Sequence, residues 1–314
     1  MRDLKNLLPR LPPPPSVKGG WPWTLESRTP RVGHVEAPPK ISIVTPSFNQ
    51  AAYLEETIRS VLLQSYPNLE YIIMDGGSTD GSVEIIRKYE PFLAHWESHK
   101  DAGQADAIYR GFERATGDIL AWINSDDYYM PSAFAWAVRN LHTSQMANLF
   151  IGGYLWVRGD GRVVCKYYGI AQDHESLLCC GQRFGQMAAF WRREAWLRVG
   201  GFDRTLRFCF DYDLFLKLTR LKNPAAIRRP LAAYRAHDAT KTATLWERVG
   251  RVEEGCLQAQ NGLQEMPVSV RAAHIKRTTK MIKKAQFFGI IEDIRDNPGY
   301  VLKRLGSSVH KLFQ

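Results

Sequence analysis

The sequence predicts an α/β fold with a mostly parallel central sheet, and two observations carry that prediction. Short, nearly continuous apolar runs occur at residues 41–44, 71–74 and 119–123, as is typical of strands that are buried on both faces of a parallel sheet. Segments with apolar residues at helical spacing lie between these runs, which gives the β-α-β-α-β order of α/β proteins.

The elements follow one another in a regular order along the first half of the chain. Residues 53–62 repeat apolar side chains at helical spacing, and residues 83–89 do so directly after a Ser/Thr/Asp cluster that can cap a helix. A less regular stretch follows, from about residue 151 to 186. We then expect a strand at residues 187–191 and helices at residues 194–199 and 212–220.

Three parts of the chain differ in composition. Residues 1–39 hold nine of the 17 prolines, which remove backbone donors and fix φ, so we expect an arm or linker. Its Trp21 and Trp23 leave two alternatives open: packing against the folded body, or disorder. Residues 40–245 carry the α/β pattern, and residues 246–314 form a basic helical extension.

The overall composition is that of a globular protein. We find no apolar run near the roughly 18 residues that a membrane span needs and no start that resembles a signal peptide, so we expect a cytoplasmic protein. The five cysteines form no C-x-x-C pair and are expected to be reduced thiols.

The formal net charge of +10 raises nucleic acid, acidic membranes and phosphorylated substrates as partners. The charge is +3 in residues 1–39, +5 in residues 246–314 and only +2 in residues 40–245. The basic character therefore belongs to the flanks, which we interpret as attachment to a surface or partner rather than nucleic-acid binding. Residues 271–284 contain six basic and no acidic residues and precede an apolar run, so a membrane-surface helix and the solvated face of a packed helix both stay open.

Polar residues follow three of the predicted strands, at the edge where open α/β sheets bind ligands. These are residues 45–50, 75–81 and 124–127, and we expect all three segments to face one crevice. Asp75 stands at a strand end before two glycines that allow close approach to the backbone, and its carboxylate can accept a hydrogen bond from an imide or a ribose hydroxyl.

Asp126 and Asp127 are adjacent carboxylates at the end of an apolar strand. They repel each other unless they are solvated or bridged by a cation, and hard oxygen ligands suit Mg²⁺ or Mn²⁺. A divalent ion held there would also bind a diphosphate. The alternative is a helix N-cap, since Met130-Pro131-Ser132 opens a helix, but one carboxylate would suffice for that.

The stretch from Lys40 to Pro131 resembles the nucleotide-sugar half of the family 2 glycosyltransferases, which have the GT-A fold. The resemblance rests on several independent motifs in the right order, at residues 41–49, 64–70, 75–81 and 117–127. It implies that Ser47 and Asn49 lie beside the nucleotide and that Asp75 binds the base, commonly uracil. The full set of implied donor contacts is Pro46, Ser47, Asn49, Asp75, Gly76, Lys100, Asp101, Gln104, Asn124, Ser125 and Asp126.

The chain departs from the family pattern in two places. Residues 100–107 resemble the segment that closes on ribose and diphosphate, but Ala105-Asp106-Ala107 replaces the usual Ala-Arg-Asn run, so Lys100 is expected to supply the cation. Asn124 replaces the first Asp of the D-x-D motif. This leaves Asp126 as the expected metal ligand, with Asp127 as its neighbour and Asn124 as a hydrogen-bonding group near the ribose.

The second half must supply a base that removes the acceptor's hydroxyl proton in an inverting mechanism. Residues 200–203 and 210–218 resemble the family's Gly-Gly-Phe-Asp element and its acidic helix start, and Asp211 aligns with the catalytic base. The helix dipole lowers its pKa and burial raises it, so the net direction stays open, as does a purely capping role. Asp213 is interpreted as support for the acceptor site.

Two further segments resemble the family. Residues 185–193 resemble a strand that lines the acceptor side, where Gln186 is the acceptor candidate and a structural role is equally open. Residues 234–242 resemble the end of the catalytic domain, where His237 is expected to complete the metal or diphosphate shell and Lys241 to add a cation. A structural histidine is the alternative for His237.

Other enzyme classes fit less well. A nucleotidyltransferase acting on sugar phosphates normally has a Gly-rich basic loop after its first strand, which residues 45–49 are not, and no P-loop or dinucleotide motif is present. A non-enzymatic basic protein that binds membrane or nucleic acid leaves the carboxylates unexplained.

We therefore expect an inverting glycosyltransferase that uses Mg²⁺ or Mn²⁺ and a UDP-linked sugar. Its acceptor is expected to be a hydroxyl of a saccharide or lipid-linked molecule in cell-surface glycan synthesis. Contact of the basic tail with the inner face of the membrane stays one of the two alternatives open for it.

Overall fold

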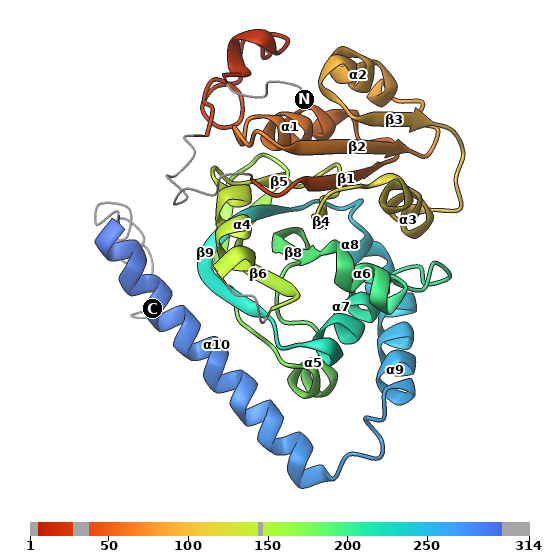
Figure 1. Cartoon of the computed structure of the whole chain (residues 1–314), viewed down its shortest axis with the longest axis vertical. Coiled ribbons are helices and arrows are strands. Elements are labelled where there is room, and N and C mark those ends of the chain that lie inside the picture. Colours follow the sequence, from red (N-terminus) through yellow and green to blue (C-terminus); the bar gives the residue numbers. More distant parts are fainter. Residues whose placement is uncertain (1–5, 28–37, 144–146, 297–314) are drawn as a thin grey trace.

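The computed structural model describes residues 6–27, 38–143 and 147–296. One nine-stranded sheet has the order β3-β2-β1-β4-β8-β6-β9-β5 (Figure 1), and β7 pairs with residues 154–157 of β6. The strands are β1 (Ile41–Ser47), β2 (Leu69–Asp75), β3 (His95–Ser98), β4 (Ile119–Trp122), β5 (Tyr128–Tyr129), β6 (Leu149–Arg158), β7 (Val163–Tyr167), β8 (Ala189–Arg192) and β9 (Ala225–Ala236).

The predicted mostly parallel sheet is confirmed. Strands β1 to β4 run parallel to one another, and β6 and β9 form a second parallel pair. β8 joins the two groups by antiparallel pairing with both β4 and β6, while β5 and β7 are antiparallel to their neighbours. The predicted strand at residues 187–191 is corrected: residues 186–188 form a 3₁₀ turn, and β8 begins at Ala189.

The helices are α1 (Ala51–Leu62), α2 (Ser82–Tyr89), α3 (Gln104–Arg114), α4 (Ala133–Thr143), α5 (His174–Cys180), α6 (Arg193–Val199), α7 (Phe210–Leu221), α8 (Lys241–Leu245), α9 (Arg251–Gln260) and α10 (Val268–Asp296). Short 3₁₀ turns occur at Leu8–Arg10, Glu90–Phe92 and Gln186–Ala188, and a π-helical turn occurs at Trp246–Gly250. Among the described residues, no helix is both long and apolar enough to cross a membrane.

Apolar side chains form two clusters, and each cluster lies on a different face of the sheet. On β1, Ile43 belongs to the cluster with α1, α2 and α4, whereas its neighbour Val44 belongs to the cluster with α3, α6 and α7. This alternation follows from the period of two along a strand, so a strand covered on both faces carries apolar residues at neighbouring positions.

The proline-rich arm packs against the body over the part that is described, residues 6–27. Arg59 on α1 is fully buried, and its guanidinium donates to the carbonyls of Pro12, Pro22 and Trp23. Trp21 Nε1 donates to the carbonyl of Tyr129 at 2.8 Å. Of the two alternatives for the arm, packing against the folded body therefore holds for residues 6–27. Residues 1–5 and 28–37 of the predicted arm and residues 297–314 of the predicted tail lie outside the described part. The predicted boundary between residues 245 and 246 falls inside the continuous helical stretch from α8 to α9.

Candidate active site

One cavity of about 770 Å³ collects residues from both halves of the sheet. The parallel half contributes the ends of β1 and β4 and the segment before α3, and the second half contributes residues 186–187, 204–211 and 239–245. The predicted residues that line the cavity are Pro46, Ser47, Gly76, Lys100, Asp101, Gln104, Asn124, Ser125, Asp126, Gln186 and Asp211. Asn49, Asp75, Asp127, Asp213 and His237 are not among the residues that line it.

Ser47 ends β1 at the cavity wall. Its side chain is only 4% exposed, and its Oγ is buried without a hydrogen-bond partner among the described residues. A buried hydroxyl without a partner carries a free-energy cost that a bound polar ligand can remove. This is the position at which the sequence placed a nucleotide contact.

Asp75 is fully buried and organises the loop after β2. Its Oδ2 accepts from the backbone of Gly77 and Ser78 and from Ser98 Oγ at 2.7 Å, and its Oδ1 accepts from Ser78 Oγ at 2.6 Å. Gly76, next to it, lines the cavity. The structure thus shows a loop-building carboxylate, and base recognition by Asp75 stays a prediction.

Asn49 connects the loops that follow β1 and β2. Its backbone has a positive φ of 52°, a conformation that asparagine adopts more readily than most residues. Its Oδ1 accepts from Thr79 N at 2.9 Å, and its own N–H donates to Ser78 Oγ. Asn49 therefore fixes the loop after β1 against the loop after β2.

The segment that leads into α3 is held by short polar contacts. Asp101 Oδ1 accepts from Gly103 N at 2.8 Å, and a Cβ added to Gly76 would lie 3.0 Å from Asp101 Oδ2, so Gly76 allows the Asp101 side chain to approach the loop after β2 closely. Gln104 Nε2 donates to Asn124 Oδ1 at 2.7 Å. The donor residues predicted from two separate segments thus meet directly.

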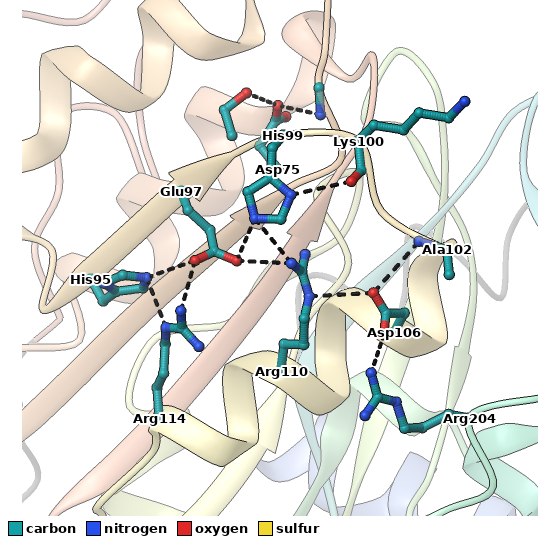
Figure 2. A network of polar contacts seen from close by, with 12 residues as sticks. Asp75, His95, Glu97, His99, Lys100, Ala102, Asp106, Arg110, Arg114 and Arg204 are labelled. Carbon is teal, nitrogen blue, oxygen red and sulfur yellow. Dashed lines mark hydrogen bonds and ion pairs between the residues drawn. The ribbon is translucent and has the colours of Figure 1, made fainter.

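A polar network runs behind this segment, from β3 to α3 (Figure 2). Glu97 is surrounded by Arg110 and Arg114 at 3.2 and 3.0 Å, with His95 and His99 at 3.2 and 3.1 Å. Burial opposes ionisation, but the hydrogen bond from His95 and the charges of the two arginines hold the pKa of Glu97 below its ordinary value.

The network continues to Asp106, the residue that departs from the family run. Asp106 pairs with Arg110 at 3.3 Å and with Arg204, which lines the cavity from the other half (Figure 2). Although burial opposes it, the hydrogen bond and charge of Arg204 lower the pKa of Asp106. Asp106 is therefore an ionised partner for a cavity arginine that sequence reasoning did not identify.

Asp126 and Asp127 have different surroundings. Asp126 lines the cavity, and its Oδ2 lies 3.1 Å from His237 Nε2. Asp127 is 1% exposed, its Oδ1 accepts from Arg235 N at 2.9 Å, and its Oδ2 has no partner among the described residues. Burial and then the charge of Asp126 raise the pKa of Asp127 well above its ordinary value. Asp126 is thus the carboxylate that a ligand in the cavity can reach.

Arg235 holds this corner together, and sequence reasoning did not identify it. Its buried guanidinium donates to the carbonyl of Asp126 at 2.9 Å, to the carbonyl of Gly159 at 3.1 Å and to Glu56 at 2.9 Å. The partners of both carboxylates lie on and after β9, which argues against their capping α4. The one signal available was the position of Arg235 in the segment that also contains His237.

The residues present fit a divalent cation in part. A carboxylate oxygen and an imidazole nitrogen at 3.1 Å have the separation of about 3 Å expected for neighbouring ligands of an octahedral Mg²⁺ or Mn²⁺. Among the described residues, however, no three His, Cys, Asp or Glu side chains cluster as a metal site. A metal would therefore need further ligands from the substrate and water.

Asp211 lies in the first turn of α7, partly buried at the cavity wall. Burial raises its pKa to about 6, against the opposing effects of hydrogen bonds from Tyr212 N and the Gln182 side chain and of the charge of Lys241. The sequence left open whether the pKa of Asp211 is raised or lowered, and desolvation raises it. A carboxylate with this pKa is ionised at neutral pH and is a better proton acceptor than an exposed one.

The two predicted acceptor residues have structural contacts. Asp213 Oδ2 accepts from Asp203 N and from Lys217 Nζ, both at 2.8 Å, so it anchors the segment before α7 without lining the cavity. Gln186 lines the cavity while its Nε2 donates to the carbonyl of Trp122 at 2.9 Å. An acceptor role for either residue stays a prediction.

A parallel sheet whose strand ends meet a second, mixed half around one carboxylate-lined cavity is the architecture of the GT-A glycosyltransferases. A sequence model of glycosyl transferase family 2 matches residues 42–159. An uncharacterized glycosyltransferase of Mycobacterium tuberculosis is 30% identical over 201 residues, which cover 62% of this chain and 75% of that protein. The chain belongs to glycosyl transferase family 2 and is a glycosyltransferase.

Other similar proteins extend this comparison. A putative teichuronic acid biosynthesis glycosyltransferase of Bacillus subtilis, TuaG, is 34% identical over 134 residues, covering 41% of this chain and 52% of that protein. Two solved structures, each 16% identical, share the fold. Staphylococcus aureus TarS 1–349 with UDP-GlcNAc has a TM-score of 0.55, covering 65% of this chain and 61% of that one. The Pyrobaculum calidifontis mannosyltransferase PcManGT with GDP-Man and Mn²⁺ has a TM-score of 0.57, covering 88% and 81%.

Proposed function

We propose that this protein is an inverting glycosyltransferase that moves a sugar from a UDP-linked donor to a hydroxyl of a saccharide or lipid-linked acceptor. The observation that carries the proposal is that Asp126, which follows β4, and Asp211, in the first turn of α7, line the same cavity. One carboxylate stands where a donor diphosphate and its cation can be held, and the other stands where a hydroxyl proton can be accepted.

Asp211 is the general base of the proposed reaction. The acceptor oxygen forms a bond to the anomeric carbon while its proton passes to Asp211, and the bond from the anomeric carbon to the diphosphate oxygen breaks, so the configuration inverts. The raised pKa, about 6, suits a base that must be ionised near neutral pH and still take up a proton.

Asp126 and His237 would hold a divalent cation together with oxygens of the donor. When bound, Mg²⁺ or Mn²⁺ supplies stabilisation of the negative charge that develops on the departing nucleoside diphosphate. Lys100 at the cavity wall adds a positive charge from the chain itself. The structure of the related PcManGT with Mn²⁺ supports the metal.

The donor nucleotide is proposed to be uridine diphosphate. Support comes from the resemblance of residues 75–81 and from the TarS structure with UDP-GlcNAc. Because PcManGT was solved with GDP-Man, the experiment must distinguish uracil from guanine as the nucleotide base.

A role in cell-surface glycan synthesis is supported by TuaG, a putative enzyme of teichuronic acid biosynthesis. Contact of α10 with the cytoplasmic face of the membrane fits its exposed basic side chains. In this arrangement the enzyme would meet a lipid-linked acceptor at the membrane surface.

A thermal-shift screen of nucleoside diphosphates and nucleotide sugars, with and without Mn²⁺, tests the proposal. We expect stabilisation by uridine compounds that depends on Mn²⁺ and is lost in Asp126→Ala. Asp238→Ala is the matched control, because Asp238 is an exposed carboxylate one residue beyond His237 that does not line the cavity. No response to any nucleotide would contradict the proposed glycosyltransferase function. A response to guanosine compounds alone would contradict uridine diphosphate as the donor nucleotide.

A further inference from the structure

Four basic residues line the cavity that contains Asp211: Lys100, Arg204, Arg207 and Lys241. Arg204 is neutralised by its ion pair with Asp106, and Lys100 belongs to the segment predicted to contact the donor. In the part of the chain that the structure describes, neither Arg207 nor Lys241 forms a salt bridge with a carboxylate within 4.0 Å. These two cations are therefore available to a ligand, and the prediction that Lys241 adds a cation to the metal or diphosphate shell is the alternative that the experiment below tests.

Arg207 and Lys241 lie close together on the wall next to the base. Arg207 precedes Asp211 by four residues, and Lys241 begins α8 and donates from its Nζ to the Arg207 carbonyl at 3.1 Å. Burial, followed by the charge of Arg207, lowers the pKa of Lys241 to about 8, against the opposing charges of Glu253, Asp211 and Asp101. Arg207, which is exposed, and Lys241, which is partly buried, thus place two positive charges on the same wall of the cavity.

Glu253, a carboxylate outside the cavity, does not neutralise the charges of Arg207 and Lys241 on the side where a ligand would bind. Glu253 accepts hydrogen bonds from the backbone N–H groups of Arg207, Phe208 and Cys209, at 2.8 to 2.9 Å, and does not line the cavity. Glu253 therefore holds the backbone of residues 207–209 from outside the cavity, while the Arg207 side chain stays on the cavity wall. Like charges in such a place repel each other, and an anion between them removes that repulsion.

We propose that Arg207 and Lys241 form a subsite for an anionic oxygen group, a phosphate or a carboxylate, carried by the acceptor. The proposal rests on the proposed function. In an inverting displacement the base and the leaving diphosphate stand on opposite sides of the anomeric carbon, so cations beside Asp211 lie on the acceptor side. The acceptor class is then an acidic or phosphorylated glycan whose charged group lies near the attacking hydroxyl.

The same chemistry has a second source, the diphosphate of the donor, and a competition experiment separates the two. Inorganic phosphate binding is measured by ³¹P NMR line broadening and by thermal shift, at an ionic strength held constant with NaCl. The measurement is repeated with saturating UDP and Mg²⁺. We expect phosphate to bind equally well with the donor site filled; displacement of phosphate by UDP would overturn the assignment to the acceptor.

Substitutions then locate the subsite. We expect Arg207→Ala and Lys241→Gln each to weaken phosphate binding about tenfold, the size expected for one charged hydrogen bond, and Lys241→Arg to retain it. Arg198→Ala, which removes an exposed arginine on α6 outside the cavity, is the matched control and should bind phosphate as the unaltered protein does.

Wild-type phosphate affinity in the double variant Arg207→Ala/Lys241→Gln would overturn the proposal. Because Arg207 is exposed, its removal should leave the fold intact, which the thermal midpoint of each variant verifies. Binding of UDP without binding of phosphate would remove the subsite and leave the proposed function standing. Failure of UDP itself to bind would count against the proposed function instead.

Discussion

Asp106 on α3 and Arg204 on the segment between α6 and α7 form an ion pair that joins the two halves of the protein at the cavity. Asp106 belongs to the segment predicted to close on the donor, residues 100–107, and Arg204 belongs to the segment that leads to Asp211. Arg204 also lies over the ring of Tyr109, with its guanidinium carbon 4.8 Å from the centroid. The pair therefore fixes the distance between donor and base elements.

Reversing this ion pair should affect turnover more than stability. Arg204 is partly exposed, so the pair contributes only about 0.2 to 1 kcal/mol to the free energy of unfolding. We expect Arg204→Asp or Asp106→Arg alone to lower kcat/KM about tenfold or more, because small misplacements of reacting groups are costly. The double exchange Asp106→Arg/Arg204→Asp should recover only part of the loss, because Arg110, the second partner of Asp106, keeps its charge. Equal damage in the double and the single variants would show that the charge pairing is unimportant.

Asp211→Asn should preserve donor binding and lower turnover by about two to four orders of magnitude, the usual contribution of a general base. The pH profile provides a second measurement. Since the pKa of Asp211 is about 6, log kcat should be level above pH 7 and should fall with a slope of one as the pH drops below 6. A profile that stays flat down to pH 5, or near-normal turnover in the Asn variant, would remove Asp211 as the base.

The same carboxylate should cost stability when it is ionised. Its pKa in the folded protein, about 6, is above its ordinary value of 3.8, so the folded state holds the proton more tightly than the unfolded state. Stability is therefore lost as the pH rises from about 4 through 6. We expect Asp211→Asn to raise the free energy of unfolding by about 1 to 3 kcal/mol at pH 7.5 and by less at pH 5. Urea unfolding at the two pH values measures this difference; an equal effect at both would point to packing rather than charge.

Removal of the metal ligands should separate two effects. Asp126→Ala should abolish the Mn²⁺ dependence of UDP binding in titration calorimetry, whereas His237→Ala should weaken Mn²⁺ about 10- to 100-fold without abolishing it. The reason is that His237 contacts Asp126 but does not itself line the cavity. Unchanged UDP affinity in Asp126→Ala with Mn²⁺ present would remove Asp126 as the ligand.

The alternation of strands and helices in residues 41–123 could be predicted because strands buried on both faces leave a local, continuous apolar signal. Ile43 and Val44 illustrate this, since neighbours on β1 enter different cores and both must be apolar. The strand ends also predicted which polar segments meet at the edge of the sheet. Gln104 and Asn124, 20 residues apart, do form a hydrogen bond there.

Contacts between distant segments could not be predicted in this way. Arg235 reaches Asp126 across 109 positions and Arg204 reaches Asp106 across 98, and no local pattern records which arginine finds which carboxylate. The pKa of Asp211 depends on how deeply packing buries it, which the helix position alone did not determine. The burial of Arg59 under the proline-rich arm is another such pairing.

The last prediction concerns the exposed face of α10. One side of this helix is buried, with Thr278 at 2% and Ala285 at 8% exposure, and Asp293 is bound by Lys166 and Tyr168. The other side is exposed and changes character along its length. Basic side chains come first, at Lys276, Lys280, Lys283 and Lys284, and large apolar ones follow, at Phe287, Phe288, Ile290 and Ile291, each at least 40% exposed.

This arrangement suits an anionic membrane surface, because lysines bind headgroups while apolar side chains enter the acyl boundary. In sedimentation with vesicles, we expect binding to phosphatidylglycerol-containing membranes and little binding to pure phosphatidylcholine. Lys280→Glu/Lys283→Glu should weaken binding roughly tenfold or more, at about 1 kcal/mol for each lysine lost. Arg198→Glu/Arg248→Glu is the matched control, since it changes the net charge equally at exposed positions on other helices. Equal loss in both pairs would mean that net charge, rather than the α10 face, governs binding, and no loss in either would leave α10 as a solvated face.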